Sequence, residues 1–321
     1  MPMSCSRYIA LSLLLLGASF FTFPGFARCQ QTQPAAKSSA PAAPAPPKAD
    51  PKADETINQL LAQLDPKKIG WMDTKYSLQA SVQGAILRAE GRYLLGPDYR
   101  VRMELGVKIG KLEGNLLTVC DGTTVWNTMH IGGEHRGTNR WDLKTVLAAL
   151  NAPGSGPQLA EEFSKSQALL GLFPLLKSLR QNMVFTKQES DPKGGLKLTA
   201  VWSPETTKTV APPNGQWPLL VPRKAYLYIG TLEGKKLWPY RIEFWGPAML
   251  RGDDSLLVEM QFRDPKILRP DEAEAKRLAQ ACTFDPGKLE VAERTKFMTD
   301  SIGQLRLQQG ARPPATNPPG K

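Results

Sequence analysis

The side chains that could carry out chemistry are few and widely spaced. The chain has two histidines, His130 and His135, and Glu134-His135 lies in a glycine-rich stretch. The helical zinc-hydrolase motif places two histidines four residues apart on one helix face, and that spacing is absent. We therefore expect ordinary loop histidines and no metal site.

Paired carboxylates occur at Glu161-Glu162 and Asp253-Asp254. Adjacent positions of a helix face apart, and the second pair lies in a turn, so neither pair forms an acid–base dyad. Gly154-Ser155-Gly156 lacks the strand-to-helix context of a nucleophile elbow. We expect no catalytic residue, no cofactor and a non-enzymatic protein.

Gly106, Gly110-Lys111 and Gly114 resemble a phosphate-binding loop only in part. The spacing is one residue short, and Leu112 stands where Ser or Thr would hold magnesium. The stretch is typical of strand and turn, so we expect these glycines to let the strands bend.

The N-terminal segment is typical of an export signal. Arg7 precedes the apolar stretch 9–16, and Gly25-Phe26-Ala27 supplies small residues at the two positions that a signal peptidase reads. We expect residues 1–27 to be removed and the mature protein to be periplasmic or secreted. Cys29 lies near the position of a lipoprotein's acylated cysteine, but Arg28 precedes it where a small residue is needed.

The mature chain is expected to have one large folded region between flexible ends. Residues 28–50 are rich in Pro and Ala and form a disordered linker, and residues 312–321 form a similar tail. Cys120 and Cys282 are the pair inside the folded region, 51–311. An oxidising compartment would permit one bridge, and the sequence leaves open whether they form it.

The formal net charge is +11. We expect no nucleic acid to bind an exported protein, and an anionic membrane surface is the natural partner of such a field. The alternative is that the charge only keeps the protein soluble. The sequence does not determine the oligomeric state.

Periodicity predicts one helix, a series of strands, a helical block and further strands. The opening helix follows Asp50-Pro51 and ends at Asp65-Pro66, and Ile57, Leu60 and Leu64 share one face. The expected strands are 76–82, 86–95, 99–107, 111–120, 124–130, 183–189, 196–202, 223–230, 236–245 and 255–263. The expected helices are 141–150, 159–173, 175–179, 271–281 and 290–307.

The fold class expected from this order is α+β. Long antiparallel strands with segregated helices, rather than alternating strands and helices, indicate this class. Asp121-Gly122 between apolar runs predicts a tight hairpin, because such turns need residues that tolerate positive φ.

Several motifs resemble the LolA-type periplasmic lipoprotein carriers. They are Glu90-Gly91-Arg92-Tyr93-Leu94 with Gly96-Pro97, then residues 117–126, 237–245 and 282–291. The resemblance implies a strongly curved, unclosed antiparallel half-barrel with helices covering an apolar concave face. Two departures are Gly96, where the carriers have an arginine, and a longer helical insertion at about 141–180.

The resemblance implies that the cavity holds an acyl chain, a lipid or a lipid-modified protein, as in lipoprotein transport or sorting in the cell envelope. The alternative is an envelope sensor that binds another protein, as the related RseB-type regulators do. The residues expected to line the cavity are Leu78, Val101, Met103, Leu105, Leu117, Val119, Trp126, Tyr226, Tyr240, Ile242 and Phe244. A mobile lid is expected to carry Leu159, Phe163 and Leu170.

Overall fold

The computed structural model describes residues 46–82, 85–151, 172–192, 194–204, 207, 222–234, 236–247 and 254–300. The strands of the first half are β1 (Trp71–Val82), β2 (Ala85–Leu95), β3 (Arg100–Ile109), β4 (Leu112–Asp121), β5 (Thr124–Ile131) and β6 (Glu134–Asp142). Those of the second half are β7 (Met183–Ser190), β8 (Leu196–Trp202), β9 (Lys224–Leu232), β10 (Lys236–Pro247), β11 (Asp254–Leu268) and β12 (Val291–Glu293). The helices are α2 (Pro51–Leu64), α3 (Leu143–Asn151), α5 (Leu172–Asn182) and α7 (Glu272–Ala281).

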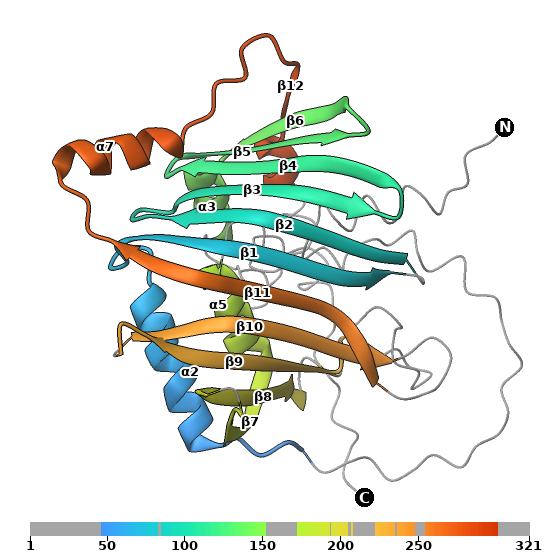
Figure 1. Cartoon of the computed structure of the whole chain (residues 1–321), viewed down its shortest axis with the longest axis vertical. Coiled ribbons are helices and arrows are strands. Elements are labelled where there is room, and N and C mark those ends of the chain that lie inside the picture. The colour runs from blue at the N-terminus through green and yellow to red at the C-terminus, as the bar shows by residue number, and fades with distance from the viewer. Residues whose placement is uncertain are drawn as a thin grey trace, which may run out of the picture.

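The strands form one sheet built from two meanders. β1–β6 and β7–β11 each run in sequence order, and β1 pairs with β11 to join them (Figure 1). The spatial order of the described strands is β12-β6-β5-β4-β3-β2-β1-β11-β10-β9-β8-β7. β12 runs parallel to β6, and the other described pairs are antiparallel.

The sheet is open, with β12 and β7 at its edges, and it is not strongly curled (Figure 1). The prediction of an unclosed, mostly antiparallel sheet therefore holds, whereas the strongly curved half-barrel does not describe this structure. The parallel edge strand β12 was also not predicted, because residues 290–307 were expected to be helical.

Turns that need positive φ join neighbouring strands. Gly122 has φ 101°, and the Asp121 Oδ1 atom accepts hydrogen bonds from the backbone N–H groups of Thr123 and Thr124, each 2.7 Å long. This confirms the hairpin predicted between β4 and β5. Gly132 and Gly133, with φ 62° and 82°, make the turn into β6, a strand that was expected to be a loop.

α2, α3 and α5 cover one face of the sheet, which we call the inner face. α2 begins at Asp50, whose side chain accepts a 3.0 Å hydrogen bond from the Lys52 N–H, and its predicted apolar stripe is buried. α2 and α5 pack on each other and on β7, while α3 packs on β5 and β6 (Figure 1). Helices segregated from an antiparallel meander confirm the α+β class.

α7 packs on the opposite face, which we call the outer face. Leu278 and Ala279 of α7 contact a small cluster of Trp71, Leu94 and Cys282. After α7 the Phe284 ring packs on Trp126 of β5, and β12 then pairs with β6. No helix within the described ranges is long and apolar enough to cross a membrane. The predicted export signal and most of the linker lie outside the described residues.

Candidate functional site

The inner face is one continuous apolar surface that runs from β5 to β7. Alternate residues of a strand point to the same face, and here they join α2 and α5 in a single core cluster. Phe185, Leu227 and Ile242 are among its largest fully buried side chains. Burial of this surface is the main source of favourable folding free energy.

Six of the eleven residues predicted to line a cavity lie together on this inner face. They are Leu78, Val101, Met103, Leu105, Ile242 and Phe244. Four others, Leu117, Val119, Trp126 and Tyr226, lie on the outer face. Tyr240 is displaced by a β-bulge between Pro239 and Arg241, so it contacts the edge of the core while its ring packs 6.2 Å from that of Tyr228.

Three of the four outward residues, Val119, Trp126 and Tyr226, have their own apolar or aromatic partners. Val119 is fully buried and pairs across the sheet with Trp126, whose ring lies 5.4 Å from that of Phe284 in the segment after α7. Tyr226 lies 6.2 Å from the Trp245 ring, with the Lys197 ammonium 4.3 Å from its centroid. The sheet is therefore covered locally on both faces, which the sequence prediction did not include.

An aromatic cluster at the centre of the inner face was not predicted as part of the site. The Phe262 ring lies 5.1 Å from that of Tyr76 and 6.2 Å from that of Tyr93. Burial raises the pKa of both tyrosines well above the usual range, so both stay neutral. The Leu172 N–H at the start of α5 donates a 3.1 Å hydrogen bond to the Tyr93 hydroxyl. The alternation of β1 and β2 is the sequence signal that could have placed these rings inward.

Two buried polar side chains of the inner face, those of Thr118 and Asn127, pair with each other. The Asn127 Nδ2 atom donates a 3.0 Å hydrogen bond to the Thr118 hydroxyl, and both residues are buried. This satisfies the amide and hydroxyl in an apolar setting, where an unpaired group would be costly. The inner face therefore offers a surface on which an apolar ligand could pack, and it does not offer a reactive group.

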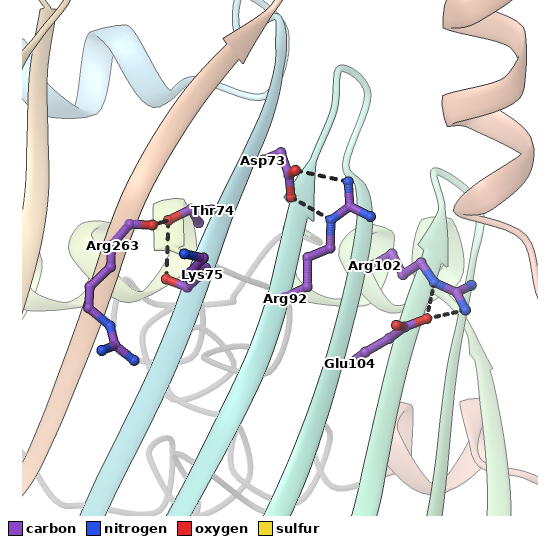
Figure 2. Close-up of polar contacts among 7 residues, drawn as sticks. All are labelled: Asp73, Thr74, Lys75, Arg92, Arg102, Glu104 and Arg263. Atoms are coloured by element: carbon purple, nitrogen blue, oxygen red, sulfur yellow. Dashed lines mark hydrogen bonds and ion pairs between the residues drawn. The ribbon is translucent and has the colours of Figure 1, made fainter.

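Outside its local apolar patches, the outer face is polar and carries ion pairs. Arg92 binds Asp73 through two hydrogen bonds of 2.7 and 2.8 Å, and Arg102 pairs with Glu104, two residues along the same strand β3 (Figure 2). Over Gly106 a hollow of about 550 Å³ is lined by charged side chains that include Arg88 and Lys108. The two faces of the sheet thus differ sharply in chemistry.

Glu243 is the most enclosed carboxylate of the outer face. Its Oε2 atom accepts hydrogen bonds from the Tyr228 hydroxyl at 3.1 Å and from the Trp245 indole at 3.0 Å. The Arg241 guanidinium lies 3.7 Å from the centroid of the Tyr228 ring. Burial, followed by the charge of Glu243, raises the pKa of Tyr228 to about 12. This cluster was missed because it depends on cross-strand register.

The lid residues Leu159, Phe163 and Leu170 lie outside the described residues. The His130 and His135 rings are 5.0 Å apart, and within the described ranges no three His, Cys, Asp or Glu side chains form a metal-binding group. Cys120 and Cys282 are both buried free thiols.

Comparisons with known proteins give only distant matches. No protein-family model matches the chain, and no curated protein matches it. The Pseudomonas aeruginosa MucA/MucB complex is matched at 14% identity over 70% of this chain and 60% of that chain, with a TM-score of 0.28. This chain therefore spans about three fifths of the length of its MucA/MucB match.

Two further solved structures are similarly remote. A DUF1329 family protein from Desulfovibrio piger is 7% identical over 67% of this chain and 92% of that chain, with a TM-score of 0.27. A domain from Vibrio parahaemolyticus, described as an outer membrane lipoprotein-sorting protein, is 11% identical over 71% of this chain and 99% of that chain, with a TM-score of 0.23. At these values the matches assign no family, and the class of the protein rests on its own α+β sheet and apolar inner face.

Proposed function

We propose that this protein is an exported, non-enzymatic protein that binds an acyl chain, a lipid or a lipid-modified protein against the inner face of its sheet. The observation that carries the proposal is the continuous apolar surface from β5 to β7. Its polar pair, Thr118 and Asn127, is internally satisfied. Such a surface suits a ligand that binds through a long apolar chain.

The free energy available on this surface is sufficient for lipid binding. Burying an acyl chain contributes about 0.8 kcal/mol per methylene, so a dozen methylenes supply about 10 kcal/mol before ordering costs. Leu105 and Val107 on β3, with Leu116 on β4, offer neighbouring apolar side chains for such a chain.

Ligand entry requires the inner face to open. Val101 and Leu105 are only 2% and 5% exposed, so a bound acyl chain must displace the groups that cover them. We propose that the segment 159–173, whose last two residues begin α5, is the lid that moves. Hydrogen exchange of the free and lipid-bound protein tests this, and equal protection of the segment in both states would exclude a lid.

The finer form of the proposal is lipoprotein transport or sorting in the cell envelope, following the expected export signal. The alternative is a sensor that recognises a protein partner. Native mass spectrometry of the purified protein is the first test between a lipid carrier and a protein-binding sensor, because a lipid carrier should retain co-purified lipid.

Photo-crosslinking locates the ligand. A fatty acid with a diazirine on its chain is expected to label Met103 and Leu105 on the inner face of β3. Leu117, on the outer face of the neighbouring strand, is the internal control and should remain unlabelled. Labels confined to the outer face, or the absence of both lipid and labelling, would overturn the proposal.

A further inference from the structure

Strands β10 and β11 diverge at one end and leave a pocket between them. Their pairing runs from Pro247 and Asp254 to Arg241 and Gln261, and the described register ends there. Beyond this point the two ribbons separate (Figure 1). The β10 bulge and the positive φ of Asp264, 52°, lie at the two sides of the gap. The pocket has a volume of about 360 Å³.

Two buried hydrogen-bond donors that line this pocket have no acceptor. Trp238 is only 3% exposed, and its indole Nε1–H has no partner among the described residues. The Arg241 Nε–H is also buried without a hydrogen bond, although this atom lies 3.4 Å from Glu243 Oε1 as an ion pair. Buried donors are normally paired, so two unpaired ones at one pocket indicate an acceptor that the described residues do not supply.

Arg263 adds a third donor to the same pocket. Its guanidinium forms no hydrogen bond or ion pair with the described residues, and it extends away from Thr74 and Lys75 (Figure 2). The acidic group of the pocket, Asp264, is already bound by the Lys75 ammonium at 2.8 Å. The pocket is thus lined by two buried N–H groups without a hydrogen bond and by the exposed Arg263 guanidinium, and two of these three donors belong to cations.

We propose that this pocket binds a phosphate group, carried by a small phosphate ester or by a lipid head group. A phosphate presents acceptor oxygens in several directions, and arginine guanidinium groups bind it with paired hydrogen bonds. The volume leaves room for a substituent the size of glycerol beside the phosphate. The six predicted cavity residues on the inner face do not line this pocket, although Trp238 and Phe262, which do line it, belong to the inner-face core cluster. Binding of a phosphate here would not require an acyl chain.

Nuclear magnetic resonance of the tryptophan indoles tests the proposal. The Trp238 indole N–H, assigned with Trp238→Phe, is followed in the full chain during titration with glycerol phosphate at constant ionic strength. A saturable shift of this resonance is expected. Arg263→Gln should lower the affinity about tenfold, because it removes a charge-assisted hydrogen bond. Arg92→Gln is the matched control, since Arg92 is another outer-face arginine but is already bound to Asp73.

The source of the phosphate is settled by a vesicle experiment with the same variants. If sedimentation with phosphatidylglycerol vesicles weakens in Arg263→Gln and not in Arg92→Gln, the group belongs to a lipid head. If only soluble glycerol phosphate binds, it belongs to a small ester. A Trp238 resonance that does not move, or equal losses in the two arginine variants, overturns the proposal.

Discussion

Glu243 joins three donors on the outer face of β9 and β10. In Glu243→Ala the Tyr228 hydroxyl and the Trp245 indole lose their shared acceptor and Arg241 loses its ion-pair partner, so the free energy of unfolding should fall by about 3 kcal/mol. Glu243→Gln keeps an acceptor oxygen and should cost only about 1 kcal/mol. Urea denaturation measures both, and equal losses would show that the hydrogen bonds do not matter.

Because two thiols are buried, the free energy of unfolding should fall as the pH rises into the alkaline range. Burial raises the pKa of the Cys120 thiol to about 12 and that of the Cys282 thiol to about 11. In the unfolded chain both ionise near pH 8.5, so the unfolded state loses its protons first. Their contribution is therefore complete below pH 8.5 and is lost as the pH rises toward 11 to 12, by at most about 1.4 kcal/mol per thiol per pH unit.

Unfolding measured between pH 8.5 and 10 checks this prediction, since tyrosines and lysines ionise mainly above that window. The double variant Cys120→Ala with Cys282→Ala should show a flatter pH dependence than the natural chain. An unchanged slope would mean that the thiols are more exposed than their burial indicates.

At the scale of elements, two glycines on neighbouring strands differ in the space that surrounds their Cα atoms. A Cβ on Gly91 in β2 would overlap the backbone carbonyl of Glu104, whereas a Cβ on Gly106 in β3 would meet nothing nearer than 3.7 Å. Gly91→Ala should therefore cost about 3 kcal/mol or more, because backbone must move, while Gly106→Ala should change stability by less than about 1 kcal/mol. Thermal unfolding of the pair tests this; similar melting temperatures would contradict the close approach of β2 and β3.

Most strands were predictable because their local alternation matches their burial. Residues of β3 alternate strictly between buried and more exposed positions, and Val101, Met103 and Leu105 were placed correctly on one face. β6 was missed because it is polar and follows a Gly-Gly turn. β12 was missed because three residues beside β6 carry no periodic signal, and their pairing depends on a distant strand.

The sequence correctly predicted which residues point to the inner face only in strands with one apolar and one polar face. β4 has apolar neighbours, Leu116-Leu117 and Val119-Cys120, so its sequence does not determine which member of each pair points inward. In β9 the tyrosines are conspicuous, but the small Ala225 and the aliphatic Leu227 face the core. The bulge that displaces Tyr240 and the gap between β10 and β11 are set by register, which one sequence does not reveal.

At the scale of the whole molecule, the net positive charge is concentrated in the terminal segments. After removal of the expected export signal with Arg7, five of the ten net charges come from residues 28–45 and 301–321, where no Asp or Glu occurs: Arg28, Lys37, Arg306, Arg312 and Lys321. On the sheet many basic groups have acidic partners, as Lys108 does with Glu113 at 2.8 Å. A membrane surface would therefore attract the ends of the chain more strongly than the folded sheet.

We expect weak, salt-sensitive binding of the mature protein to anionic vesicles. Each basic residue near such a surface contributes about 1 kcal/mol, so replacing Arg306, Arg312 and Lys321 with Gln should weaken binding by up to about two orders of magnitude. Lys108→Gln, which removes a charge already paired on the sheet, is the control and should have little effect. Sedimentation with phosphatidylglycerol vesicles measures the affinities.

The same experiment at high salt separates this attraction from a covalent anchor. Charge attraction extends about 8 Å at physiological salt and about 3 Å at 1 M, so the bound protein should be released by 1 M salt. In cells, retention on membranes through such a wash would contradict electrostatic binding. If Cys29→Ser then released the protein, the anchor would be an acyl group on Cys29, and the export signal would belong to a lipoprotein rather than to a protein cleaved after Ala27.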